Sequence, residues 1–283
     1  MVRASASPMN ISDQDLEAIC RLMYQHFGIH LNDQKRALVV SRLHMHLRSM
    51  GMTSFKEYID YIVSTGATQG LGQLVDRLST NHTFFFREKE HFDFLVKTAL
   101  PEILSRLEKK GTRDLRIWSA GCSSGEEPYS LVVYLMEFLG LQYSSWDAGL
   151  LATDISGQAL APAKSAVYSD DRLTLVPEHF KQKYFQKLPD KNYMVKDFVK
   201  KEVTFRRLNL MTKPFPFKRA FHVIFCRNVM IYFDQQTRED LVRRFFENTE
   251  PGGYLFIGHS ESLRRESCPY DYVLPAVYRK RDA

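Results

Sequence analysis

The sequence lacks several features that would place it in a special class. Its 283 residues contain no apolar run near the ~18 residues of a membrane span, and the first ten residues lack the apolar core of a signal peptide. The four cysteines form no C-x-x-C pair and no Cys/His cluster at zinc-ligand spacing. We therefore expect a cytoplasmic protein without disulfides, without a metal site and without direct membrane insertion.

The chain also has fewer acidic than basic residues. It contains 33 Asp and Glu and 39 Lys and Arg, which gives a net charge of +6. Such a chain favours an acidic partner, which could be nucleic acid, anionic lipid or an acidic protein surface. No recognised nucleic-acid-binding motif occurs, and the basic residues are not interleaved with stacking aromatics. We therefore expect no nucleic-acid partner.

The first part of the chain, residues 10–80, has the pattern of a small helical domain. Ser12 and Asp15 form a capping-box pattern before a first helix, and a second helix is predicted from about Gln34 to Gly51. A third helix is predicted to begin at Ser54. Residues 81–114 are predicted to form a linker and a connecting helix.

Residues 115–283 alternate between strand-like and helical segments, which predicts an α/β domain with a parallel sheet. Pro251–Gly253 is predicted to form a turn. The Lys-rich stretch at about 168–205 is predicted to be an inserted β-subdomain that includes the β-prone residues 203–205. The predicted strands of the main sheet are 115–118, 149–153, 221–225 and 254–257, and the predicted helices are 126–139, 157–166 and 235–248.

A glycine-containing loop, Gly121 to Gly125, joins the first predicted strand to a helix that begins with Glu126 and Glu127. It is neither a Walker loop nor the dinucleotide fingerprint, and a tight turn without a ligand is the alternative. Carboxylates at a helix N-terminus repel phosphate, which disfavours a pyrophosphate cofactor. They suit a cofactor with a cationic or neutral centre, such as the sulfonium and ribose of S-adenosylmethionine.

Polar residues at two other places could serve the same ligand. Asp154 ends the second predicted strand, where a carboxylate can accept hydrogen bonds from a ribose or can cap the next helix. Arg227, Asn228 and Tyr232 follow a buried strand and should face the ligand crevice, although Arg227 could instead pair with a nearby acid.

Six motifs in order resemble the chemotaxis receptor methyltransferase (CheR) family across Ile11 to Tyr278. They are N-x-T-x-F-F-R at 81–87, G-x-x-x-G-E-E-P-Y-S at 121–130, Asp-Ile at 154–155, Asn-Leu at 209–210, C-R-N-V-M-I-Y-F at 226–233 and G-H-S-E at 258–261.

The resemblance implies a Rossmann-like class I methyltransferase domain with a small inserted β-subdomain, preceded by an all-helical domain. It further implies transfer of a methyl group from S-adenosylmethionine to receptor glutamates, with S-adenosylhomocysteine as the product. The family's proposed catalytic pair corresponds to Arg87 and Tyr232. The cofactor contacts it implies are Asn81, Thr83, Arg87, Gly121, Glu127, Asp154, Asn209, Leu210, Arg227 and Asn228.

The resemblance also implies a docking surface for the acidic helical cytoplasmic domain of bacterial chemoreceptors, to whose arrays the protein would be recruited. Basic residues without an acidic neighbour run from Lys35 to Lys56, and a solvated charged face is the alternative. The short connection 186–192 favours docking without a receptor C-terminal peptide, and we expect a monomer. The predicted docking residues are Lys35, Arg42, His46 and Arg48.

The sequence is also compatible with other functions. A class I methyltransferase for a small molecule or RNA would share the fold and the cofactor. A signalling adapter that binds S-adenosylmethionine or its product without catalysis is disfavoured by the presence of Arg87 and Tyr232. An NAD-dependent dehydrogenase is disfavoured by the missing G-x-G-x-x-G.

Overall fold

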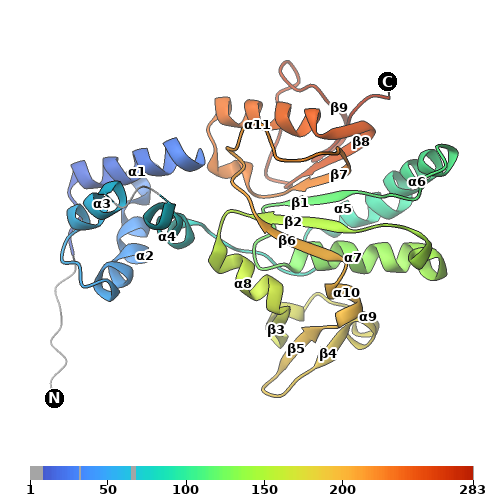
Figure 1. Cartoon of the computed structure of the whole chain (residues 1–283), viewed down its shortest axis with the longest axis horizontal. Helices are drawn as coiled ribbons and strands as arrows, with labels where there is room; N and C mark the ends of the chain where they lie inside the picture. Colours follow the sequence, from blue (N-terminus) through green and yellow to red (C-terminus); the bar gives the residue numbers. More distant parts are fainter. Residues whose placement is uncertain (1–8, 32, 65–67, 283) are drawn as a thin grey trace. The chain divides into compact units, whose positions relative to one another are not determined.

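The computed structural model describes residues 9–31, 33–64 and 68–282. Contacts within the chain divide it into two compact units (Figure 1). The first unit comprises Met1–Thr80 together with Tyr232–Asp234, and the second comprises Asn81–Ile231 and Gln235–Ala283. Among the described residues, no helix is both long enough and apolar enough to span a membrane.

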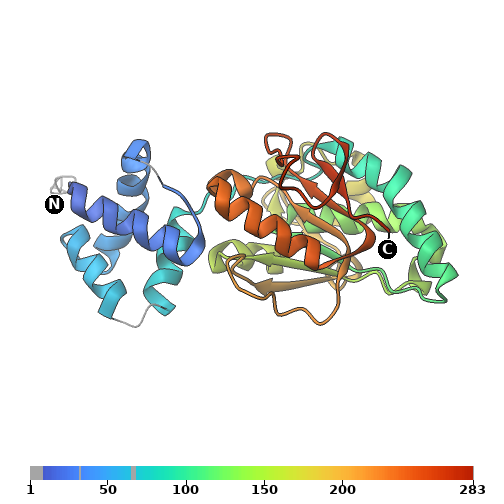
Figure 2. The same ribbon diagram turned by 90° about the horizontal axis from the view of Figure 1, so that it is seen from above.

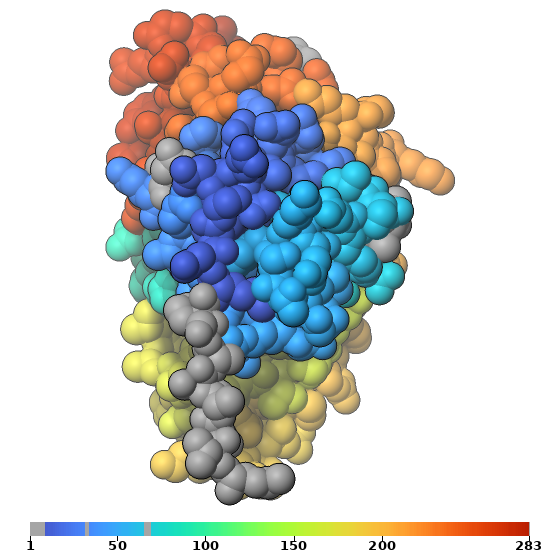
Figure 3. Space-filling view, turned by 90° about the vertical axis from the view of Figure 1, so that its left-hand side faces the viewer, coloured from blue at the N-terminus to red at the C-terminus, as the bar shows by residue number. Residues whose placement is uncertain are grey.

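The first unit is built from helices, as predicted. Ser12 caps α1, because its side-chain oxygen accepts a hydrogen bond from the amide of Asp15 at 3.1 Å. Ser54 accepts in the same way from the amide of Glu57 at 3.2 Å. The second helix begins at Arg36, after a 3-10 turn, rather than at Gln34. The helices are α1 Asp13–Phe27, α2 Arg36–Ser49, α3 Phe55–Ser64 and α4 Thr68–Leu78, and their colours run from blue to teal in Figure 3.

The second unit contains a seven-stranded sheet in the order β6-β2-β1-β7-β8-β10-β9. Neighbours from β6 to β8 are parallel, and β10 is antiparallel to β8 and β9. This confirms the predicted Rossmann-like fold. The strands are β1 Ile117–Ala120, β2 Leu150–Asp154, β6 Val203–Arg207, β7 Phe221–Cys226, β8 Thr249–Ile257, β9 Asp271–Leu274 and β10 Val277–Arg279.

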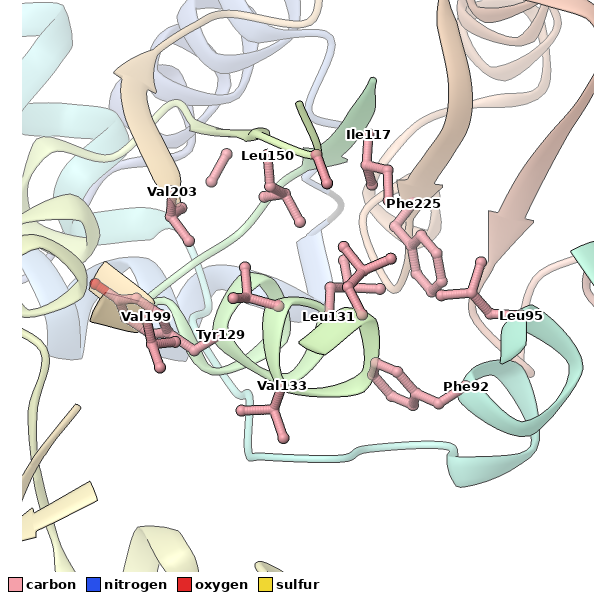
Figure 4. Close-up of a cluster of buried hydrophobic side chains, with 14 of the residues drawn as sticks. Phe92, Leu95, Ile117, Tyr129, Leu131, Val133, Leu150, Val199, Val203 and Phe225 are labelled. Atoms are coloured by element: carbon pink, nitrogen blue, oxygen red, sulfur yellow. The ribbon is translucent and has the colours of Figure 1, made fainter. Parts of the chain in front are cut away.

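Helices cover both faces of this sheet, as Figure 2 shows from above. Ile117 and Phe225 point to the face covered by α7 and α5 (Figure 4). Trp118, the next residue of β1, points to the other face and packs against Phe245 of α11, with ring centroids 5.3 Å apart. This alternation buries both faces, as a parallel sheet requires. The helices are α5 Lys89–Phe94, α6 Leu100–Lys109, α7 Glu126–Leu139, α8 Gly157–Ser165 and α11 Gln235–Glu247, with a π-helical segment, Leu95–Ala99, between α5 and α6.

A three-stranded antiparallel sheet in the order β3-β5-β4 forms the inserted part, which lies beside α7 and α8 in Figure 1. The prediction also placed residues 203–205 in this insertion, and that placement was wrong. Val203–Arg207 is β6, which pairs with β2 at the edge of the main sheet. The insertion contains β3 Val167–Ser169, η4 Asp170–Leu173, α9 Glu178–Tyr184, β4 Phe185–Lys187, β5 Asn192–Val195 and α10 Asp197–Lys200.

The predicted turn at Pro251–Gly253 was also wrong, because these residues lie inside β8. The register between β7 and β8 shifts here, so the extra residues form an irregularity in the strand. Gly252 has φ +71°, and a Cβ atom there would lie 1.4 Å from Nη1 of Arg106. Glycine therefore lets the guanidinium lie against the strand.

Candidate functional site

The carboxyl ends of β6, β2, β1 and β7 meet at one edge of the sheet, since these strands are parallel. The chain leaves β1 toward β2 on one side, whereas β7 lies on the other side of β1. This reversal of strand order is where open α/β sheets bind ligands. The loops after these strands carry most of the predicted cofactor residues.

The glycine loop after β1 is held close to its neighbours. Gly121 has φ +88°, and a Cβ atom there would lie 2.3 Å from Cγ2 of Val229. The amides of Gly121 and Cys122 both donate to the carbonyl oxygen of Thr153, at 2.7 and 2.9 Å. The hydroxyl of Ser123 is buried, and none of the described residues forms a hydrogen bond with it. The loop therefore places an unsatisfied polar group at the ligand-binding edge.

Asp154 joins two loops by hydrogen bonds. Its Oδ2 accepts from the amide of Ser123 at 2.8 Å, and its Oδ1 accepts from the amide of Ser156 at 2.9 Å. The cap of α8 is Ser156, whose hydroxyl oxygen accepts from the amide of Ala159. Asp154 therefore binds the loop after β1 and the loop after β2 at the same time. The ribose contact stays a prediction.

Arg227 lies at the centre of a buried ion cluster. Its side chain is 2% exposed, and Nη1 lies 3.0 Å from Oε2 of Glu127. Nη2 lies 3.1 Å from Oε2 of Glu88 and also donates to the carbonyl oxygen of Arg87. Arg227 therefore pairs with nearby acids in the structure, which is the alternative to a ligand contact that the sequence left open. The pairing brings the segment around Arg87 to the start of α7.

Glu127 is held from two sides. The hydroxyl of Ser119 donates to its Oε1 at 2.7 Å, and Arg227 contacts its Oε2. Burial raises the pKa of Glu127, whereas the charge of Arg227 and these hydrogen bonds oppose the rise. The carboxylate is thus fixed in one orientation at the edge where β1 ends.

Arg87 is a quarter exposed and is less constrained than Arg227. Its Nη1 donates to the carbonyl oxygen of His82 at 2.9 Å, and its Nε lies 3.8 Å from Oε1 of Glu88. The guanidinium carbon lies 5.5 Å from the ring centroid of Phe84. Asn81 is exposed and Thr83 is half-buried. Arg87 therefore borders the buried cluster through Glu88 and is more exposed than Arg227.

The remaining cofactor residues follow β6 and β7. The amide of Leu208 donates to the carbonyl oxygen of Asp154 at 3.0 Å, which places Asn209 and Leu210 beside the end of β2. Asn228 has φ +59°, a conformation that asparagine tolerates well. The loops after β6 and β7 therefore lie at the same edge of the sheet as the loops after β2 and β1.

Sequence reasoning gave no role to Glu261. Its buried carboxylate accepts hydrogen bonds from the amides of Gly258 at 2.6 Å, Asn228 at 2.9 Å and Ile231 at 3.2 Å. Burial raises the pKa of Glu261, whereas these amides oppose the rise. The G-H-S-E motif identified this residue, but nothing in the sequence indicated that its carboxylate fixes the loop after β7.

Glu88 was also missed, and it belongs to a group of metal-ligand type. Within the described residues, one donor atom each from Glu88, His91 and His259 lie within 4.8 Å of one another. Burial, followed by the charge of Arg227, lowers the pKa of His91 to about 3, so its imidazole is neutral. Because Oε2 of Glu88 is already paired with Arg227, we assign this carboxylate to holding the arginine.

The other predicted residues belong to the first unit. The carbonyl oxygen of Tyr232 accepts from the amide of His30 at 2.8 Å. Arg42 donates to the carbonyl oxygens of Leu78 and Ser79 at 2.8 Å, so it supports the end of α4. His46 does not fit the predicted docking surface, because it is only 8% exposed and its ring packs against the buried Tyr58. Lys35 and Arg48 are exposed.

Comparison with known proteins gives two family matches. Residues 81–273 match the SAM binding domain of CheR methyltransferase, and residues 14–79 match its all-alpha domain. A chemotaxis protein methyltransferase of Borreliella burgdorferi is 42% identical over 272 residues, which are 96% of each chain. The Escherichia coli chemotaxis protein methyltransferase is 37% identical over 257 residues, which are 89% of this chain and 86% of that protein.

Proposed function

Since the chain belongs to the CheR methyltransferase family, whose larger domain binds S-adenosylmethionine, we propose that it is a protein-glutamate O-methyltransferase. Its substrates would be glutamate side chains of chemoreceptors, and the names of its relatives support a role in chemotaxis. One observation carries the proposal. The carboxylates of Glu127 and Asp154 lie on both sides of the glycine loop at the reversal of strand order.

The polar groups at this edge of the sheet fit S-adenosylmethionine. Asp154, at the end of β2, is placed to accept from the ribose hydroxyls, and Glu127, at the start of α7, is placed to accept from the amino-acid end. The buried hydroxyl of Ser123, which has no hydrogen-bond partner in the described part of the chain, offers one more polar contact. The glycine loop is followed by two glutamates rather than by a phosphate-binding lysine, so the site suits a cofactor without phosphate.

The bound cofactor would supply a methyl group already activated by the sulfonium. A substrate carboxylate is ionised at neutral pH, so the enzyme needs no strong general base. Aligning the two reactants can lower the barrier by ~7–11 kcal/mol. We assign this alignment to Arg87 and Tyr232. The side chain of Arg87 is partly exposed, and a guanidinium has five N–H donors, so it is suited to orient a carboxylate.

We assign receptor docking to the exposed basic residues of the first unit. Lys35 and Arg48 would approach an acidic helical surface, whereas Arg42 supports α4 and His46 contributes to the core. Arg48→Glu should reduce receptor methylation and leave the affinity for S-adenosylhomocysteine unchanged. Arg21→Glu, an exposed reversal on α1, is the matched control. A loss of cofactor affinity in the Arg48 variant would contradict a docking role.

The proposed function is tested with methyl-labelled S-adenosylmethionine and a chemoreceptor cytoplasmic fragment. After reaction, mild base should release labelled methanol from the receptor, because a glutamate methyl ester is base-labile. Label that survives base would show methylation of another group. Cofactor binding without transfer to any of several receptors would favour another substrate or a non-catalytic adapter.

A further inference from the structure

One arginine of the inserted subdomain extends out of it toward the glycine loop. Arg172 lies in η4, directly after β3. Its Nη1 donates to the carbonyl oxygen of Thr83 at 3.1 Å, and its Nη2 donates to the hydroxyl oxygen of Ser124 at 3.1 Å. Nη2 also lies 2.9 Å from Oε1 of Glu126. A single guanidinium therefore joins the segment before α5, the glycine loop and the start of α7.

The carboxylate that Arg172 contacts is completely buried. Glu126 is 0% exposed, and its Oε2 accepts a hydrogen bond from the hydroxyl of Ser124 at 2.7 Å. Burial raises the pKa of Glu126, whereas the bond from Ser124 and the charge of Arg172 oppose the rise. Arg172 is therefore the cation that compensates a buried charge beside the glycine loop.

A second side chain of the insertion holds the same loop. The hydroxyl of Tyr168, on β3, donates to the carbonyl oxygen of Ser124 at 2.7 Å. Its ring packs edge-on against Phe85, with centroids 5.0 Å apart. A Cβ atom at Gly125 would lie 2.8 Å from the Tyr168 hydroxyl oxygen. The insertion thus contacts both the 81–87 segment and the glycine loop.

We infer that Arg172 is a positioning residue for the cofactor, which acts by fixing Thr83 and the glycine loop relative to each other. The family resemblance implies cofactor contacts at Thr83 and at Gly121, so the inference rests on the proposed function as a methyltransferase. Arg172 itself makes no cofactor contact in this scheme. The two Nη atoms of its guanidinium contact Thr83, Ser124 and Glu126 at the same time, and the single ammonium group of lysine cannot reproduce that geometry.

The simpler alternative is that Arg172 only neutralises Glu126 and so stabilises the fold. The two roles can be separated by a second substitution. In the double variant Arg172→Ala/Glu126→Gln, the buried charge is absent, so the stability lost by removing the arginine should return. The double variant still lacks the hydrogen bonds by which Arg172 connects Thr83 to Ser124, so a positioning role predicts that cofactor binding stays weak.

The experiment measures the Kd of S-adenosylhomocysteine by calorimetry and the melting temperature for each full-length variant. Arg172→Ala should raise the Kd about tenfold or more, as expected for coupling between contacting residues. Arg172→Lys should have an intermediate effect, and the double variant should regain the melting temperature but not the Kd. Lys187→Ala, at an exposed position on β4, is the control and should match the wild type.

Two results would overturn the inference. The first is an unchanged Kd in Arg172→Ala or, if that variant does not fold, in Arg172→Lys. The second is a double variant in which Kd and melting temperature recover together, because charge compensation would then explain everything. Binding is measured without a receptor. A wild type that binds the product but methylates no receptor would therefore contradict the proposed substrate and leave the role of Arg172 intact.

Discussion

Arg227→Met tests how strongly the buried ion cluster depends on its cation. The substitution leaves Glu127 and Glu88, whose side chains are 12% and 13% exposed, without their common partner. Breaking a buried ion pair by removing one partner costs about 3–5 kcal/mol. At ~2–4 °C per kcal/mol for a domain of this size, the melting temperature should fall by roughly 6–20 °C.

The loss should also depend on pH. Burial raises the pKa of Glu127 and Arg227 opposes that rise, so removing Arg227 raises this pKa further. A carboxyl group whose folded pKa is raised binds its proton more tightly in the folded state, so stability falls as pH rises through that pKa. The difference in unfolding free energy between wild type and variant should therefore be larger at about pH 8 than at about pH 5.5.

The assay is urea unfolding followed by tryptophan fluorescence. Both tryptophans, Trp118 and Trp146, belong to the second unit, so the signal reports on the unit that contains the cluster. Arg243→Met, at an exposed position on α11, is the control and should stay within about 0.5 kcal/mol of the wild type. A loss below about 1 kcal/mol in Arg227→Met, or a loss of equal size at both pH values, would refute the reasoning.

Three further substitutions probe the site. Gly121→Ala should weaken S-adenosylhomocysteine binding about tenfold in calorimetry, because φ is +88° and Val229 occupies the place of the Cβ atom. The control is Gly111→Ala, which has φ +69° in open space and should affect only stability. Arg87→Ala should lower receptor methylation at least about tenfold with little change in melting temperature, and normal turnover would exclude its orienting role. Glu261→Gln should cost about 1–3 kcal/mol in urea unfolding, since an amide group replaces an acceptor of backbone amides, whereas Glu266→Gln should be neutral.

The sequence predicted the α/β architecture well, because its strands and helices have strong local signals. The helix at 126–139 agrees with its predicted bounds, since a glycine precedes it and another follows it. Local pattern could not decide which sheet contains Val203–Arg207, because its pairing partner β2 lies about fifty residues earlier. The same limit applies to Pro251–Gly253, whose residues favour a turn but lie within a strand.

The site was predicted at the level of segments rather than contacts. Motifs and strand ends pointed to Glu127, Asp154 and Arg227, and the structure joins these regions. The sequence could not indicate that Glu88 and Glu261 hold the arginine and the adjacent loop, because those contacts connect residues far apart in the chain. It also could not separate the exposed Arg48 from the buried His46 on a helix whose polar residues lie on several sides.

The contacts of Arg172 have a thermodynamic consequence beyond the cofactor itself. If Arg172 positions the glycine loop as we infer, the position of η4 and the occupancy of the loop are linked. Linkage is reciprocal, so any molecule that binds the insertion and favours one position of η4 changes the affinity for the cofactor, and the cofactor changes the affinity for that molecule by the same factor. A ligand of the inserted subdomain and the cofactor would then influence each other through one side chain, although they bind different parts of the second unit.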